Sequence, residues 1–221
     1  MKRTLLFTSY ITSSKKDEVQ KKIDILLELG CTGGKRFIKH TTDEGLIYSK
    51  KFDYDPNKLF ITSHGFGEIC QVSQIDEYRH DHGKSFVWRK DGSLLSIENY
   101  EDGERYGLFT LYYSNGNKIQ EGNYTSRSTF PYSDKTGLWK GWYENGQKCE
   151  ELNYQNGNLD GLCTRWYGNG QKCEELNYQN GNLDGLCTRW YGNGQKNYEE
   201  NYKDGKLISE KRWKEDGSVK E

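Results

Sequence analysis

The sequence predicts a mainly β protein: an elongated, single-layer antiparallel β-meander of hairpin repeats about 24 residues long, with a small N-terminal α/β cap. The residues Asn145–Lys172 recur letter for letter as Asn169–Lys196, so the period is 169 − 145 = 24 residues. The hydrophobic content is only 33%. A thin sheet, in which each unit touches only its neighbours, suits this composition better than a thick core does.

Each regular unit contains two turn signals between strand-like residues. In the unit at residues 161–184 they are Asn169-Gly170 and Asn180-Gly181. Asn-Gly supplies the positive φ angles of a two-residue type I′ turn, which joins paired strands. We therefore expect strands at about residues 162–167 and 172–178.

A two-residue turn at Asn169-Gly170 also sets the strand register. It would pair Arg165 with Glu174 and Gly161 with Tyr178. The same rule pairs a glycine with a tyrosine in every other unit, which predicts a structural role for these residues, with the ring lying across the bare glycine. The other pairs are Gly83–Tyr100, Gly107–Tyr124, Gly137–Tyr154 and Gly185–Tyr202.

This register divides the side chains of one unit between two faces, because they alternate along a strand. The first face is expected to carry Gly161, Cys163, Arg165, Tyr167, Lys172, Glu174, Leu176, Tyr178 and Leu183. The second is expected to carry Leu162, Thr164, Trp166, Cys173, Glu175 and Asn177. Each face has an aromatic stripe that continues from unit to unit.

Residues 1–44 show a different pattern. Residues 3–11 are apolar and β-branched enough for a strand, and Ser13-Ser14 followed by acidic residues predicts the start of a helix. Apolar residues then recur at helical spacing until Gly30, which can end the helix. This strand and helix are interpreted as a cap over the open end of the sheet, and a recognition element is the alternative.

Residues 45–82 form an irregular β region with expected strands at 45–53, 58–63 and 68–79, and degenerate repeats are one interpretation of it. The clear repeats begin at Gly83. They are expected at 83–106, 107–136, 137–160, 161–184 and 185–208, with a partial unit at 209–221; residues 125–136 lengthen the second of these by six residues.

Charge and composition narrow the classes of partner. The net charge is −1 and the regular units show no basic patch, so we expect no nucleic-acid binding and no strong membrane binding. No secretory signal and no apolar run of membrane-spanning length is recognised, which predicts a cytoplasmic protein (in the host cell, or in the particle if the source is viral). No two of the six cysteines face each other in the predicted register, so free thiols are expected.

Few residues suggest chemistry. His80 and His82 could place two metal ligands on one side of a strand, but no cysteine or carboxylate stands at a fixed spacing, so no metal and no cofactor is predicted. The segment 30–35 fails the phosphate-loop spacing and is interpreted as a helix end. Cys31 or Cys70 could act as a nucleophile beside a histidine, but no local sequence pattern supports that pairing.

The pattern G-L-x-x-x-W-Y-x-N-G-x-K-x-x-E-x-N-Y-x-N/D-G resembles the MORN-repeat family in its variant form, from Gly83 to about Gly217. The resemblance implies antiparallel β-hairpin repeats and a role in assembly or binding. Variant repeats of this kind are similar to those in bacterial antitoxin-like or immunity proteins and in proteins of large DNA viruses.

We therefore expect a non-enzymatic repeat scaffold that binds another protein through an extended β surface. An antitoxin or immunity protein that neutralises a toxin is the alternative, and a small enzyme or metal site within residues 1–82 is a further one. The expected contact residues repeat from unit to unit on the second face. They are Trp142, Trp166, Trp190, Leu162 and Leu186.

Overall fold

The computed structural model describes residues 3–11, 16–42, 45–63, 69–126 and 133–220, with backbone alone at 3–11, 16–19, 33–42, 45–52, 126 and 133. The chain divides into two compact units, residues 1–104 and 105–221. The predicted helix start at Ser13-Ser14 and the centre of the predicted insertion, 127–132, lie outside the described residues.

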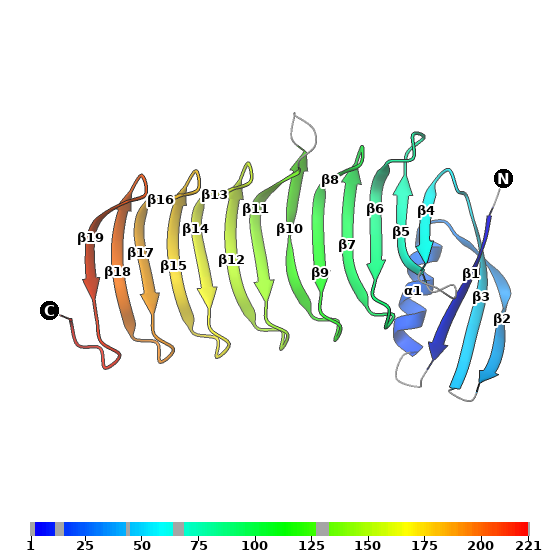
Figure 1. The fold of residues 1–221 in the computed structure, drawn as a ribbon, viewed down its shortest axis with the longest axis horizontal. Coiled ribbons are helices and arrows are strands. Elements are labelled where there is room, and N and C mark those ends of the chain that lie inside the picture. Colours follow the sequence, from blue (N-terminus) through cyan, green and yellow to red (C-terminus); the bar gives the residue numbers. More distant parts are fainter. Residues whose placement is uncertain (1–2, 12–15, 43–44, 64–68, 127–132, 221) are drawn as a thin grey trace. The chain divides into compact units, whose positions relative to one another are not determined.

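The first unit combines one helix with two sheets (Figure 1). Strand β3 lies between β1 and β2 in a three-stranded sheet, and β4 to β7 belong to a second sheet. The elements are β1 (Arg3–Ile11), α1 (Lys16–Glu28), β2 (Thr32–Thr42), β3 (Gly45–Tyr54), β4 (Leu59–Ser63), β5 (Ile69–Ile75), β6 (Asp81–Trp88) and β7 (Leu94–Glu101).

The second unit is a continuous antiparallel meander (Figure 1). Its strands are β9 (Gly107–Tyr112), β10 (Lys118–Ser126), β11 (Ser133–Trp142), β12 (Lys148–Gln155), β13 (Asn158–Leu159), β14 (Gly161–Trp166), β15 (Lys172–Gln179), β16 (Asn182–Leu183), β17 (Gly185–Trp190), β18 (Lys196–Lys203) and β19 (Lys206–Arg212); β8 (Glu104–Arg105) spans the boundary. Within the described ranges, sixteen strands form one open sheet ordered β19-β18-β17-β15-β14-β12-β11-β10-β9-β7-β6-β5-β4, with β8, β13 and β16 as side branches. The predicted β-meander is confirmed.

The N-terminal strands and helix agree only in part with those predicted from the sequence. The strand at 3–11 matches β1, and Gly30 ends helix α1 with φ +89° and a hydrogen bond from its N–H to Leu27 O of 3.0 Å. Strand β2 was missed, because its polar sequence lacks an alternating apolar pattern. The strand at 45–53 exists as β3, but it pairs with β1 and β2 and not with the repeats.

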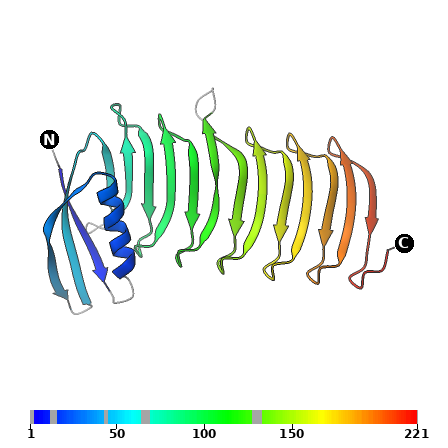
Figure 2. The same ribbon diagram turned by 180° about the vertical axis from the view of Figure 1, so that it is seen from behind.

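The core of the first unit lies between α1 and strands β4 to β6. Ile23 and Leu26 of the helix are 3% and 0% exposed, and they belong to one cluster with Leu59, Ile69, Val72, Phe86 and Trp88. Figure 2 shows the helix axis running roughly along the strands of this unit. The predicted helical apolar stripe thus packs on one face of the sheet.

The predicted glycine–tyrosine register is confirmed in every unit: Gly161 faces Tyr178, and the same pairing holds for 83–100, 107–124, 137–154 and 185–202. The reason for the glycine differs from the predicted one. Gly161 has φ +95°, a conformation that disfavours a Cβ atom, and a Cβ there would meet Asn153 Cβ at 3.6 Å and not a tyrosine ring.

Two different turns alternate along the repeats. Asn180-Gly181 is the predicted type I′ turn, since φ is 49° and 82° at its two residues. The type I′ prediction for Asn169-Gly170 is wrong, because only the glycine has a positive φ, of 83°. Gly170 N–H donates to Tyr167 O at 2.9 Å, which makes a type I turn followed by a left-handed glycine.

An aromatic ring does cover a glycine elsewhere in the second unit. Trp139 is 1% exposed and packs between Phe109, Tyr124 and Tyr154. A Cβ atom on Gly122 would fall 2.2 Å from this indole. Gly122 therefore makes room for Trp139. In later units a cysteine replaces this tryptophan and a leucine replaces this glycine.

The two glycine roles predict different costs for alanine. Gly161→Ala should lower the free energy of unfolding by about 1–2 kcal/mol, because alanine must adopt the left-handed conformation. Urea unfolding followed by tryptophan fluorescence measures the change.

Gly168→Ala is the matched control, because Gly168 lies outside the left-handed region and a Cβ atom added there would have no neighbouring atom within 4 Å. Glu144 occupies the equivalent position of the preceding unit. The control should leave stability unchanged or raise it by up to about 1 kcal/mol. Equal losses in the two variants would contradict the assigned role of Gly161.

Candidate interaction surface

The two faces of the sheet in the second unit differ in which apolar side chains they expose. On the side that we call the tyrosine face, Cys163 and Leu176 lie opposite each other and are 2% and 4% exposed. On the opposite side, the leucine face, Leu138, Leu162 and Leu186 are 40%, 45% and 50% exposed. We call these three residues the leucine row, because they occupy the same position in successive units.

A β-bulge in each hairpin changes the predicted faces of two residues. The register shifts between Arg165 and Trp166, so Trp166 faces Lys172, whereas a two-residue turn at Asn169-Gly170 would have placed it opposite Cys173. Lys172 forms an ion pair with Glu175, which places it on the leucine face and not beside Glu174.

The cysteine of the bulge turns the other way. Gly141 faces Glu150 as Arg165 faces Glu174, so a Cβ atom built on it would point to the tyrosine face. This atom would lie 2.7 Å from Glu150 Cγ and 3.0 Å from Cys149 Sγ, so both side chains lie on that face. Cys149 and Cys173 hold equivalent positions in successive units. The assignment of Cys173 to the face of the tryptophans was therefore wrong.

The predicted contact tryptophans are half-buried, and two of them lie under lysines of the preceding unit. Lys148 Nζ lies 5.3 Å from the Trp166 ring centre and 2.6 Å from Glu151 Oε1. Lys118 lies in the same way 5.6 Å from Trp142. A cation over an indole face is attracted by the ring electrons, so the lysine both covers and holds the ring.

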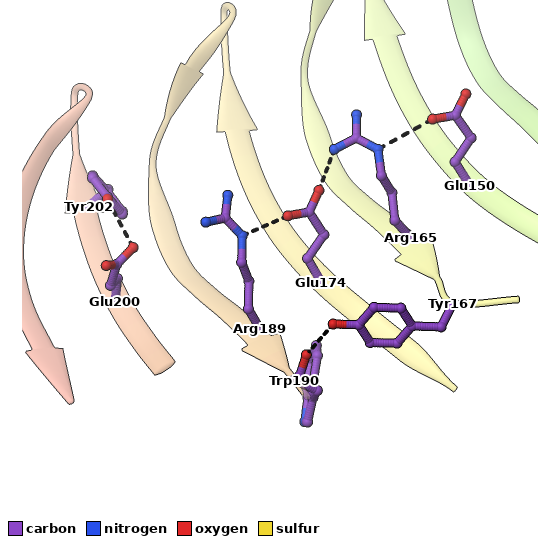
Figure 3. A network of polar contacts seen from close by, with 8 residues as sticks. All are labelled: Glu150, Arg165, Tyr167, Glu174, Arg189, Trp190, Glu200 and Tyr202. Carbon is purple, nitrogen blue, oxygen red and sulfur yellow. Dashed lines mark hydrogen bonds and ion pairs between the residues drawn. The ribbon is translucent and has the colours of Figure 1, made fainter. Parts of the chain in front are cut away.

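A row of tyrosine hydroxyls ties each unit to the next. Tyr143 Oη donates to Trp166 O at 2.6 Å. Tyr167 Oη donates in the same way to Trp190 O at 2.7 Å, as Figure 3 shows. Sequence reasoning missed these bonds, although the Trp-Tyr pair recurs in each regular unit. They fix the backbone beneath the indoles.

Asparagines fix the backbone of the leucine row. Asn153 Nδ2 donates to Leu162 O at 2.6 Å, and Asn177 donates to Leu186 O in the same way. The carbonyl groups of Leu162 and Leu186 are thus held by an asparagine of the preceding unit. The row is therefore a rigid apolar feature with a polar border.

The tyrosine face carries an alternating chain of charges (Figure 3). The predicted Arg165–Glu174 pair is confirmed, and the chain extends across units in both directions. Arg165 Nε lies 3.3 Å from Glu150 Oε2, and Arg189 Nε lies 2.7 Å from Glu174 Oε2.

Four segments of the chain match the family model described as MORN repeat variant, at residues 105–125, 135–156, 159–180 and 183–204. Residues 105–204 therefore contain four repeats that match the MORN repeat in its variant form. No curated protein matches the chain. MORN repeats are typically scaffolds for protein or membrane interaction. No helix in the described part of the chain is long and apolar enough to cross a bilayer.

The N-terminal candidates for chemistry do not converge in the described residues. His80 Nδ1 lies 3.3 Å from Asp76 Oδ2, and His82 Nδ1 lies 3.5 Å from a different carboxylate, Asp102 Oδ1. His64 lies outside the described residues, as does the side chain of His40. No group of three or more potential metal ligands occurs over the ranges that the structure describes.

The two N-terminal cysteines have different surroundings in the described part of the chain. Burial raises the pKa of the Cys31 thiol to about 11, so it is protonated at neutral pH. Cys70 Sγ lies 3.0 Å from Thr62 Oγ1. A cavity of about 420 Å³ in the first unit is lined by acidic, apolar and lysine side chains, including Glu28 and Asp53, and by no histidine or cysteine. All six cysteines of the chain are free thiols.

The charge chain of the MORN repeats makes stability depend on pH. Burial opposes ionisation of Glu174, but hydrogen bonds from Arg189 and Arg165 outweigh it and lower its pKa. Because the folded-state pKa is below the unfolded one, the stabilisation is complete above about pH 5 and is lost as the pH falls through the folded-state value.

Glu174→Gln should therefore lower the free energy of unfolding by about 1–2 kcal/mol at pH 7, and the loss should shrink below about pH 4. Urea unfolding of both proteins across this range measures the difference. Glu199→Gln, which breaks only a partly exposed pair with Lys196, should cost less than about 0.5 kcal/mol. A Glu174 difference that stays constant down to acid pH would refute the assignment.

Proposed function

We propose that the protein is a non-enzymatic scaffold that binds another protein on the leucine face of its MORN repeats. The observation that supports this most directly is the leucine row: three leucines at one position of successive units, each 40–50% exposed. Exposed apolar residues scattered singly are ordinary, but a row repeated in register indicates a binding surface. Trp142, Trp166 and Trp190 form its half-buried border.

The leucine row and the tryptophans contribute differently to this surface. The leucines supply accessible apolar area, whereas the indoles of Trp142 and Trp166 already contact a lysine of their own sheet. Large aromatic residues beside an apolar patch are frequent energetic centres of protein interfaces. Neutralisation of a toxin is one form that such binding could take, and it stays a prediction.

Binding through the leucine row predicts a specific loss. The double variant Leu162→Thr/Leu186→Thr should retain less than about one fifth of the protein captured from an extract of the native host, measured by quantitative mass spectrometry. Threonine keeps the strand preference of these exposed positions, so the melting temperature should change little.

Leu207→Thr is the matched control for this capture. Leu207 is 48% exposed, and it faces Tyr202, so it lies on the other side of the sheet. Its replacement should leave capture unchanged. Equal loss in the control and in the double variant would contradict the assignment of the leucine face.

Trp166→Ser tests the border of the surface. Removing the half-buried indole should cost about 2 kcal/mol, a shift of roughly 4–8 °C in melting temperature, and should also reduce capture at 10 °C, where the variant remains folded. Circular dichroism checks the fold in the same samples. If capture persists while the melting temperature falls, the tryptophans are structural and only the leucines remain in the proposed site.

A further inference from the structure

In the first unit, a helix covers the side of one repeat that corresponds to the leucine face. Strands β6 and β7 keep the repeat register, with Gly83 facing Tyr100 and a bulge between Val87 and Trp88. Their residues can therefore be matched to those of a regular repeat. Lys84, Phe86 and Trp88 correspond to Leu162, Thr164 and Trp166.

Helix α1 packs on this face of the first unit. Ile23 and Leu26 of the helix share a buried cluster with Phe86 and Trp88, which are both 4% exposed. Lys22 Nζ lies 4.8 Å from the centre of the Trp88 ring. The chain thus contains one example of an amphipathic helix seated on the leucine-face positions of a repeat. This helix runs along the strands, so it is a precedent for the chemistry of a bound helix and not for its direction.

Two repeat positions that pack against the helix cluster are apolar in the first unit, whereas the same positions are charged in the regular units. Leu94 and Ile97 pack against its cluster, and the regular unit has the Lys172–Glu175 ion pair at the equivalent positions. Without a helix, the repeat covers its own tryptophan, because Lys148 takes the place over Trp166 that Lys22 takes over Trp88.

The leucine position differs in the opposite way: it is charged in the unit that the helix covers and apolar in the regular units. In the first unit this position is Lys84, whose Nζ lies 3.0 Å from Glu28 Oε1 at the end of α1. In the regular units the same position is a leucine with 40–50% of its surface exposed. A helix seated there would need an apolar residue where α1 presents a glutamate.

We propose that the leucine row binds an amphipathic α-helix of a partner protein, lying across the strands with its apolar side on Leu138, Leu162 and Leu186. This inference rests on the proposed function. Successive leucines are two strands apart, about 9.6 Å. Seven residues of an α-helix advance about 10.5 Å, so one apolar residue per heptad can meet one leucine per repeat.

An extended proline-rich segment has a similar spacing, since three residues of polyproline II advance about 9.3 Å. Such segments bind grooves lined by accessible aromatic rings. Here the accessible residues are leucines, and the indoles beside them are half-covered by lysines. The chemistry of the face therefore favours a helix.

The test places a photoreactive benzoylphenylalanine at residue 162 of the full-length chain, with residue 207 as the matched control site. After irradiation in the host extract, the cross-linked partner segment is sequenced by mass spectrometry and synthesised as a peptide. We expect apolar residues at heptad spacing in this peptide and a gain of helical circular dichroism when the protein is added. We also expect at least about fivefold weaker binding to Leu162→Thr/Leu186→Thr than to Leu207→Thr.

Each other outcome overturns a stated part of the inference. A cross-linked segment that stays extended or proline-rich on the protein would refute the helix and leave protein binding intact. If residue 162 cross-links no protein that residue 207 does not also cross-link, both the helix proposal and the proposed function are refuted. Unchanged affinity for the double variant would show that the helix binds elsewhere.

Discussion

The alternation of two glycine turns determines the face of every side chain in the repeats. The type I′ turn at Asn180-Gly181 adds no extra residue, whereas the turn that ends at Gly170 brings a bulge into the following strand. Because one residue of shift exchanges the faces of a strand, the bulge alone places Lys172 over the tryptophan side and its neighbour Cys173 on the other.

Contacts between neighbouring units make a stack of small hairpins cooperative. A hairpin of two strands is barely stable alone, and stacked repeats depend on their shared interfaces. Here the interfaces are polar as well as apolar. The Tyr143 hydroxyl and the Asn153 amide each donate to the next unit, and Arg189 pairs with Glu174 of the preceding one. This explains how a sheet with few buried apolar residues holds a fixed register.

Sequence reasoning found what depends on local periodicity and missed what depends on turn geometry or on neighbouring units. The repeat length, the glycine–tyrosine register and the Arg165–Glu174 pair follow from the 24-residue pattern. The bulge was missed because Asn-Gly suits both turn types; Asn169 Oδ1 accepts the N–H of Gln171 at 3.0 Å and stabilises the less expected one. Strand β2 carries no apolar alternation, so its pairing with β3 is visible only in three dimensions.

The chemistry of the leucine-face positions depends on what covers them. A tryptophan in this sheet must be shielded on one side, and the chain does so with a helix at Trp88 and with a lysine–glutamate pair at Trp166. The ion pair adds little stability by itself, but it keeps the centre of the face soluble and leaves apolar area only at the leucine position. Among the described residues of strands β11 to β17, the leucine position therefore carries the most exposed apolar side chain of this face.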